Sequence, residues 1–216
     1  FVAAKTDTSV KGSRGITMFI VDKGTPGFSV GRALDKQGWR CSDTAELIFD
    51  NCRVPRENIL GELNKGFYSI MRNFQNERTV LAAQSMGEAA RALELTLQYV
   101  QERKAFGATL WDKQTIRQRL AMLQAKVEAG RQLTYHAAWL DARGVDAVKE
   151  VSMAKAFCCE LVNEVMYTCL QFHGGFGYVR ESAIERMSRD ARVQSIGGGA
   201  TEVMLEEIAK RSVVGG

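Results

Sequence analysis

The spacing of hydrophobic residues divides the chain into two parts. From about Lys65 onward, apolar residues recur every three or four positions, which is the spacing of one face of an α-helix. Three such stripes occur, and each lies in a segment of roughly 30 residues. The stripes are Met86, Ala90, Leu93, Leu97 and Val100; Ile116, Leu120, Leu123 and Val127; and Val151, Ala154, Cys158, Leu161 and Val165. Short connections at 105–112 and 144–146 join these segments, which predicts an antiparallel helical bundle.

The first 62 residues carry a different pattern, in which short apolar runs alternate with turn residues. These runs are 15–22, 28–34 and 45–54. Runs of this length, rich in β-branched and aromatic residues, predict strands, and Pro55 is expected to end the last of them. The fold class that follows is mainly α, with an antiparallel helical bundle preceded by part of an antiparallel β-domain.

Composition narrows the possible functions. The chain has 216 residues, of which 45% are hydrophobic and 25% charged, as in ordinary globular proteins. Its net charge of +4 comes from basic residues that are interleaved with acids, so no nucleic-acid surface is expected. No apolar run is long enough for a membrane span. The chain begins Phe1-Val2-Ala3-Ala4, without Met and with the character of a strand, so we expect it to be part of a longer protein.

The five cysteines and two histidines indicate neither a disulfide framework nor a metal site. The cysteines show no Cys-x-x-Cys spacing, which favours reduced thiols and an intracellular setting. Cys158 and Cys159 fall within an apolar helical pattern and are expected to be small core residues. His136 and His173 each lack a second ligand at metal-binding spacing, so no metal is expected.

Two glycine clusters flank a short helical pattern near the C-terminal end. The clusters are Gly174, Gly175 and Gly177, and then Gly197, Gly198 and Gly199. A helix is predicted between them at about 182–193, and another is expected to begin at Ala200 or Thr201. Glycine allows the backbone to approach a ligand, and helix N-termini bind anions through free N–H groups. Glycine beside a helix is also commonly a cap or a connector, so the spacing alone leaves both interpretations open.

Three blocks of the sequence resemble the acyl-CoA dehydrogenase family, in the order that the family has them. QFHGGFGY at 171–178, with ERMSRDARVQSIGGGATEVM at 185–204, resembles the C-terminal signature of that family. QERKAFGATL at 101–110 looks like the family's flavin-contacting turn. RVPRENILGELNKGFYSIM at 53–71 is similar to the crossing from its middle β-domain into its helical domain. Together these blocks extend the resemblance over essentially the whole chain.

The resemblance implies a domain organisation, a reaction and partners. It implies that 1–62 is the C-terminal half of the middle β-domain, that 63–216 is the C-terminal domain of four-helix-bundle type, and that the N-terminal helical domain is absent from this chain. It also implies α,β-dehydrogenation of an acyl-CoA thioester to the trans-2-enoyl-CoA, with FAD as cofactor and electron-transfer flavoprotein as acceptor. A homodimer or homotetramer is implied, in the bacterial cytoplasm or the mitochondrial matrix.

The reaction needs a base for the weakly acidic α proton. A carboxylate in an apolar, dehydrated pocket suits this task because such a pocket raises its pKa, and the thioester carbonyl needs hydrogen-bond donors. In much of the family the base directly precedes a Gly-Thr or Gly-Ser pair, a place that Gly198 occupies here. A minority, resembling long-chain and isovaleryl-CoA dehydrogenases, carry the glutamate in a Glu-Arg pair on the earlier long helix, which matches Glu77-Arg78. The resemblance thus implies Glu77 as base; the alternative is a solvated helix glutamate.

The resemblance also implies binding residues. Those that match contacts to the FAD of the neighbouring subunit are Arg103, Phe106, Gln114, Gln171, Gly174 and Gly175. Those that match contacts to the flavin of the same subunit are Ala200, Thr201 and Glu202. Those that match the acyl-CoA site are Phe74, Gln75, Asn76, Arg78, Gly198 and Gly199. Ala200 replaces the usual Thr or Ser, and Gln75 replaces an acid that contacts CoA in several relatives. An exposed cation favourable to the helix dipole is an alternative role for Arg103.

Other roles remain open. An acyl-CoA oxidase relative would share these residues, and Gly198 alone would suit a non-catalytic helical module for acyl-CoA binding or oligomerisation. The pair Arg189 and Asp190 is interpreted either as a structural ion pair or as part of a site. The sequence does not fix the acyl chain length, although the resemblance slightly favours long-chain substrates.

Overall fold

The structure, a computed structural model, describes residues 1–212 and divides into two compact units. One unit contains Phe1–Lys36 and Arg40–Phe74, and the other contains Gln37–Trp39 and the residues from Gln75 onward. The predicted fold class is confirmed, because long helices dominate the chain and its few strands are short and antiparallel.

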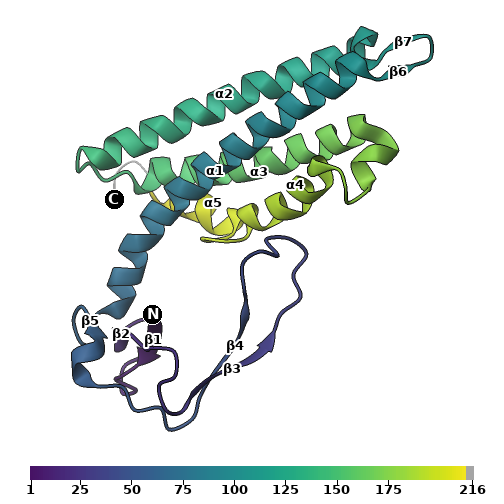
Figure 1. Cartoon of the computed structure of the whole chain (residues 1–216). Coiled ribbons are helices and arrows are strands. Elements are labelled where there is room, and N and C mark those ends of the chain that lie inside the picture. The colour runs from purple at the N-terminus through teal and green to yellow at the C-terminus, as the bar shows by residue number, and fades with distance from the viewer. Residues whose placement is uncertain (213–216) are drawn as a thin grey trace. The chain divides into compact units, whose positions relative to one another are not determined.

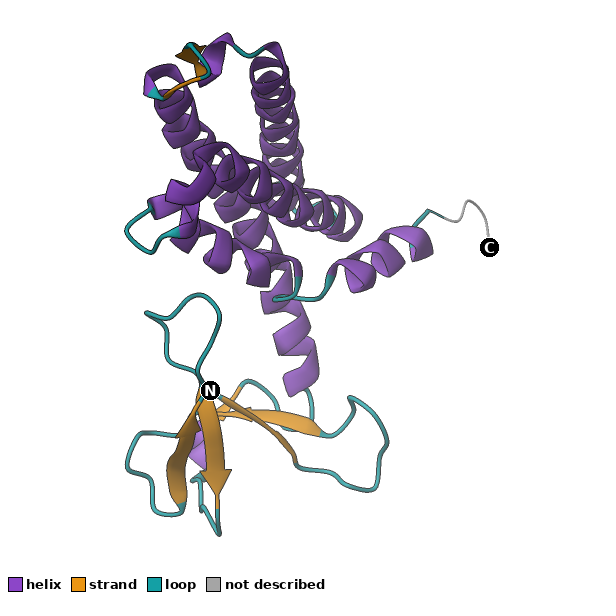
Figure 2. Cartoon of the chain, turned by 90° about the vertical axis from the view of Figure 1, so that its right-hand side faces the viewer, coloured by secondary structure: helices purple, strands orange, loops and turns teal. Residues whose placement is uncertain are grey.

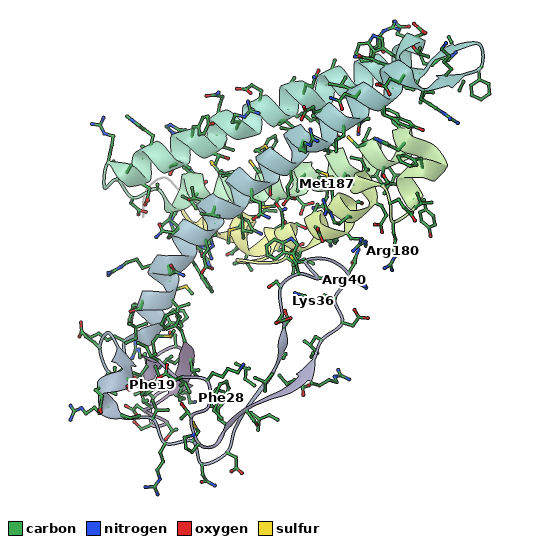
Figure 3. The ribbon with its side chains drawn as sticks, viewed as in Figure 1. Phe19, Phe28, Lys36, Arg40, Arg180 and Met187 are labelled. Carbon is green, nitrogen blue, oxygen red and sulfur yellow. The ribbon has the colours of Figure 1, made fainter. Side chains whose placement is uncertain are left out.

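The first unit contains two small antiparallel sheets, drawn in orange in Figure 2. Strands β1 (Val2–Lys5), β2 (Ile16–Phe19) and β5 (Ile59–Leu60) form a sheet in the order β1-β2-β5, in which Ala3 pairs with Met18. Strands β3 (Phe28–Ala33) and β4 (Ala45–Phe49) form the second. Phe28, labelled in Figure 3, stacks on Phe49 with ring centroids 4.9 Å apart.

The strand predicted at 45–54 is shorter than expected. Strand β4 ends at Phe49, because Asn51 has a φ of 47° and turns the chain out of the extended conformation. The backbone N–H of Asp50 donates to the carbonyl of Gly27 at 2.8 Å, which closes this end of the β3–β4 pair. A 3-10 turn, η1 (Arg56–Asn58), follows Pro55.

The predicted bundle is present in the second unit. Its long helices are α1 (Gly66–Glu102, of which 66–74 belong to the first unit), α2 (Gln114–Ala142) and α3 (Val148–His173). Helices α4 (Ala183–Ala191) and α5 (Thr201–Lys210) complete it. A hairpin of β6 (Lys104–Ala105) and β7 (Ala108–Thr109), unpredicted by hydrophobic spacing, leads through the turn η2 (Leu110–Asp112) from α1 into α2. Figure 1 shows that α1 and α2, which this hairpin connects, run side by side in opposite directions.

The apolar stripes form the core of the bundle. Met86, Leu93, Leu120, Leu123 and Val165 are all buried, as the periodicity predicts. Helix α3 is the central element, since it buries residues on several faces, among them Cys158, Cys159 and Cys169. Helices α1, α2 and α3 meet at Gly130, where a Cβ would lie 2.5 Å from the sulfur of Met86 and 3.2 Å from that of Cys158. Close packing of this kind fixes the position of α2 against α1 and α3.

The described residues lack two features. Between residues 1 and 212, no helix is long and apolar enough to cross a membrane. The same residues contain no group of three or more His, Cys, Asp or Glu side chains that could hold a metal ion. All five cysteines are free: Cys41 is exposed, Cys52 is half-buried, and the other three are buried.

Candidate functional site

Glu77 and Gly198 line the same cavity, although they lie far apart in the sequence. The cavity has a volume of about 440 Å³ and lies between α1 and the segment that leads from α4 to α5. Its lining consists of Trp39, Asn76, Glu77, Val80, Leu81, Gln84, Val193, Gly197 and Gly198. The carboxylate of Glu77 therefore borders a largely apolar cavity. Position 198, where the common family pattern has a glutamate, lies in the wall of the same cavity.

Two buried cations hold the glycine segment 197–199 from its inner side. The Nε of Arg78 donates to the carbonyl of Gly198 at 3.0 Å, and the Nζ of Lys155 donates to the carbonyl of Gly199 at 2.6 Å. Arg78 is 7% exposed and Lys155 is 0% exposed. Burial lowers the pKa of both side chains from their ordinary values, because it disfavours the charged form. Arg78, which was predicted to contact acyl-CoA, thus supports through its guanidinium the glycine segment that borders the cavity.

The backbone at 198 and 199 needs glycine. Gly198 has a φ of +66° and Gly199 a φ of +107°, conformations that residues with a Cβ rarely adopt. A Cβ on Gly198 would lie 2.7 Å from Cδ1 of Leu81, and one on Gly199 would lie 2.9 Å from Cε of Met204. A glutamate at position 198 would therefore be strained and would crowd α1.

The described chain does not bury Glu77. Its side chain is exposed, as is that of its neighbour Asn76, while Phe74 and Gln75 are half-buried. The dehydrated surroundings expected for the base are thus not supplied by residues 1–212. Gln75 contributes one notable atom: its Oε1 is buried and accepts no hydrogen bond from the described residues. Such an acceptor is available to a donor on a ligand.

A buried polar network lies behind this cavity, and the sequence did not reveal it. Nε2 of Gln84, a cavity-lining residue, donates to Oε1 of Glu88 at 2.8 Å, and Nε2 of Gln194 donates to the other oxygen of Glu88. The hydroxyl of Ser85 lies within hydrogen-bonding distance of Gln194 Oε1, and 3.3 Å from the sulfur of Cys159. Burial raises the pKa of the Glu88 carboxyl, against the lowering effect of the two amide donors. The network fixes the Gln84 end of the cavity.

Four of the residues predicted to bind FAD line a second cavity, of about 420 Å³. Arg103, Gln171, Gly174 and Gly175 meet there, at the end of α1 and at the turn η3 (Gly174–Tyr178) after α3. The other lining residues are Tyr99, Leu110, Ile116, Phe172, His173 and Phe176. A Cβ on Gly174 or Gly175 would meet no atom within 4 Å, so the backbone here is open to a ligand.

Aromatic stacking supports this second cavity. The ring of Tyr99 stacks on that of His173 with centroids 4.4 Å apart, and its hydroxyl donates to the carbonyl of His173 at 3.3 Å. The Nδ1–H of His173 donates to the carbonyl of Cys169 at 2.8 Å. Burial lowers the pKa of His173, because it disfavours the charged ring. His173 thus has a packing role here.

Two further residues predicted to bind FAD lie outside this cavity's lining. Phe106 is at the tip of the β6–β7 hairpin, with a φ of 54° and 95% of its surface exposed. Gln114 is exposed at the first turn of α2. Neither therefore joins Arg103 in lining that cavity.

The residues 200–202 lie where α5 begins, as predicted. Ala200 is the N-cap and supplies no side-chain hydrogen bond to the helix start. The hydroxyl of Thr201 donates to Oε1 of Glu160 at 2.5 Å, so it is directed toward α3. Glu202 is exposed. Of these three residues, Thr201 borders a third cavity, of about 750 Å³, formed by α2, α3 and α5.

The interpretation of Arg189 and Asp190 as an ion pair is wrong. Arg189 pairs with Glu185, one helical turn earlier, with Nε 2.6 Å from Oε1. Asp190 accepts the backbone N–H of Trp39 at 2.7 Å. Both residues hold the segment Gln37–Trp39 on α4, since Arg189 also donates to the carbonyl of Gln37. Trp39 is thereby placed at the wall of the Glu77 cavity.

Comparison with known proteins identifies relatives of this chain. Residues 64–213 match the family described as acyl-CoA dehydrogenase, C-terminal domain. The chain is 43% identical over 202 residues to the caffeyl-CoA reductase-Etf complex subunit CarC of Acetobacterium woodii, covering 94% of this chain and 53% of that protein. It is 42% identical over 200 residues to an acyl-CoA dehydrogenase of Bacillus subtilis, covering 93% of this chain and 53% of the relative.

Solved structures agree with these matches. The crystal structure of a probable acyl-CoA dehydrogenase from Mycobacterium abscessus superposes with a TM-score of 0.94 and 44% identity. That match covers 97% of this chain and 55% of the other. The chain therefore spans about half the length of the relatives it matches.

Proposed function

Because the chain belongs to the acyl-CoA dehydrogenase family, we propose that it forms part of an FAD-dependent enzyme that dehydrogenates an acyl-CoA thioester at its α,β bond, with Glu77 as the base. The family resemblance seen in the sequence motifs is confirmed by the matches. The reaction, the substrate and the residue roles are our proposal. The observation that carries it is the shared cavity of Glu77 and Gly198.

The cavity supports a relocated base. Position 198, where the common pattern has a glutamate, is a glycine whose backbone conformation and crowding against Leu81 disfavour any side chain. The carboxylate of Glu77 borders the same space from α1, and among residues 1–212 no other Asp or Glu lines that cavity. A base must reach the proton that it removes, and in this cavity Glu77 is the group placed to do so.

We assign part of the FAD to the second cavity. Arg103 can pair with a pyrophosphate through two N–H groups, and the open backbone at Gly174 and Gly175 admits a ligand without a clash. Gln171 and the rings of Tyr99 and Phe176 would complete the contact. When bound, the flavin supplies the acceptor for the hydride that leaves the β carbon.

We assign Phe106 and Gln114 to the same flavin contact across a subunit boundary. Phe106 is an almost fully exposed aromatic side chain, which is an arrangement typical of an interface residue. A homodimer or homotetramer follows from this assignment. At the start of α5, we assign the backbone N–H groups of Ala200, Thr201 and Glu202 to the flavin of the same subunit, because the Thr201 hydroxyl already donates to Glu160.

For the substrate we assign Phe74, Gln75 and Asn76 to acyl-CoA binding, with the unpaired Oε1 of Gln75 as an acceptor for a donor group of the CoA portion. Gly198 and Gly199 contribute the cavity wall, and Arg78 acts through them. Among chain lengths, the Glu77-Arg78 pair favours the long-chain branch. Electron-transfer flavoprotein is the proposed acceptor, supported by the name of the Acetobacterium woodii relative, and the proposed location is the bacterial cytoplasm or the mitochondrial matrix.

The test is anaerobic bleaching of the flavin by a panel of acyl-CoAs of increasing chain length. We expect the parent protein to bleach, and Glu77→Gln to bind flavin and acyl-CoA but to bleach at least about 100-fold more slowly, as expected for loss of a general base. Glu94→Gln is the matched control: an exposed carboxylate on the same helix, paired with Arg91 and away from the cavity. It should bleach at the parent rate.

Each of the other possible results points to a different function or a different base. Equal bleaching in Glu77→Gln and the parent would place the base elsewhere. Bleaching by no acyl-CoA at all, with the flavin bound, would favour a non-catalytic module. Rapid reoxidation of the bleached flavin by oxygen, without electron-transfer flavoprotein, would identify an oxidase.

A further inference from the structure

Lys155 is a buried cation that the proposed reaction does not use directly. It lies on the central helix α3, fully buried, and its Nζ donates to the carbonyl of Gly199 at 2.6 Å. Among the described residues, Lys155 forms no close ion pair, and the carboxylates of Glu160 and Glu202 act on it only as weaker, longer-range charges. A buried charge without an ionic partner destabilises a fold, and an apolar side chain of similar volume is often more favourable. The position of this cation therefore calls for a role other than stability.

Lys155 acts on the segment together with Arg78. The two cations take successive carbonyls, those of Gly198 and Gly199. In a trans peptide the carbonyl and the following N–H point in opposite directions. The described chain has no cis peptide bond, so fixing these two carbonyls inward turns the N–H groups of Gly199 and Ala200 outward. The cations thus determine which way the backbone of the cavity wall faces.

Arg78 directly follows Glu77 on α1, so this clamp also sets where the wall lies relative to the carboxylate. Arg78 ties the wall to α1 and Lys155 ties it to α3. Without Lys155, one of the two ties is lost, and the positive-φ backbone at 198–199 has less to hold it in its strained conformation.

We propose that Lys155 is a positioning residue: by holding the carbonyl of Gly199 it fixes the glycine segment 197–199 at the spacing from Glu77 that the reaction needs. This role rests on the proposed dehydrogenation. A positioning role differs from a packing role in its consequences. Replacing Lys155 by an uncharged side chain should slow the reaction but leave the stability of the fold unchanged or higher.

The test compares Lys155→Met with Lys126→Met in the complete protein. Lys126 is the matched control because it is a half-exposed lysine on α2, paired with Glu164 and absent from the Glu77 cavity. Two quantities are measured: amide hydrogen exchange of a peptide spanning 196–204, and the rate of flavin bleaching by acyl-CoA. We expect exchange in that peptide to speed up roughly 10- to 100-fold in Lys155→Met, the effect of losing one charged hydrogen bond, and to stay unchanged in Lys126→Met.

Bleaching should slow by a similar factor in Lys155→Met, with little change in the acyl-CoA concentration needed for half-saturation and no fall in melting temperature. Lys155→Gln, which keeps a shorter neutral donor, should fall between the parent and Lys155→Met in both measurements. Unchanged exchange in Lys155→Met would overturn the clamp, and faster exchange with an unchanged bleaching rate would overturn its role in the reaction. If the parent itself does not react with acyl-CoA, the dehydrogenation proposal fails, while the exchange data still decide whether Lys155 holds the segment.

Discussion

The turn Gly174–Tyr178 and the segment 197–199 are both glycine-rich and both lie beside helices, but they are held in opposite ways. At Gly174 and Gly175 the backbone is exposed and no atom lies near the position of a Cβ. At Gly198 and Gly199 a Cβ would meet Leu81 and Met204, and the segment is tied by Arg78 and Lys155. A positive φ does not separate the two regions, because Gly174 also has one, of +58°. The first is an open surface, and the second is a fixed wall.

This difference separates two uses of glycine. An open glycine leaves room for something outside the chain, which suits the proposed contact with FAD. A crowded glycine lets the backbone pack closely against neighbouring atoms, which suits a wall that must keep its distance from Glu77. Gly177 shows that the two uses can be neighbours: a Cβ there would lie 2.6 Å from the carbonyl oxygen of Leu170, so it belongs to the crowded kind.

The largest expected effect is on folding stability. Gly199→Ala should lower the free energy of unfolding by about 1–3 kcal/mol, because alanine would be strained at a φ of +107° and its Cβ would lie 2.9 Å from Cε of Met204. Gly175→Ala, which has neither problem, should change it by less than about 0.5 kcal/mol while weakening flavin binding. Urea denaturation of both variants and the parent measures this. Equal losses in the two variants would remove the distinction between wall and surface.

The pH dependence of stability should also differ between the two regions. Burial lowers the pKa of His173 below its ordinary 6.5, so the unfolded chain binds the proton more readily, and stability falls as the pH drops from 6.5 toward the folded-state value. Burial likewise lowers the pKa of Lys155 below 10.5, so stability rises as the pH climbs from its folded-state value toward 10.5.

Single variants isolate these two contributions. In His173→Gln, the free energy of unfolding should no longer decline below pH 6.5 as it does in the parent. In Lys155→Met, it should no longer rise at alkaline pH. Each variant should keep the pH dependence that is assigned to the other residue. Denaturation titrations at a series of pH values measure both. If a variant keeps the pH dependence that is assigned to its own replaced residue, another group titrates in that pH range.

The smallest effect concerns the aromatic support of the open turn. Tyr99→Phe removes a hydroxyl that donates to the carbonyl of His173 at 3.3 Å but keeps the stacked ring, so we expect a loss of about 0.5–1 kcal/mol. Tyr135→Phe, at an exposed tyrosine on α2, should cost nothing measurable. Thermal unfolding of the pair is a sufficient measurement, and a loss as large as that of Gly199→Ala would mean that the turn is as constrained as the wall.

Most of the helical architecture could be predicted, because the burial of one helix face leaves a period in the sequence. The stripes through Leu93, Leu123 and Val165 are buried as expected. The β6–β7 hairpin was missed because each strand has only two residues, too few for any pattern. The end of β4 was missed because it depends on the backbone of Asn51, which hydrophobicity does not record.

The site was only partly predictable. The resemblance pointed to Glu77 and Gly198, and the structure places both at one cavity. Lys155 and Gln194 were missed, because a polar residue is ordinarily assigned to solvent. Lys155 is buried because α3 is packed on several sides, which only the tertiary structure reveals. The sequence gives one indication of this burial, since Lys155 lies among apolar residues in VSMAKAFCC.

The central claim is that the carboxylate of Glu77 takes the α proton of an acyl-CoA. The most direct measurement is exchange of α-deuterium from a labelled acyl-CoA into water, followed by mass spectrometry, with the parent, Glu77→Gln and Glu94→Gln. The account predicts exchange with the parent and with Glu94→Gln, and none above the rate without protein for Glu77→Gln that still binds the ligand. Exchange by Glu77→Gln at the parent rate would contradict it.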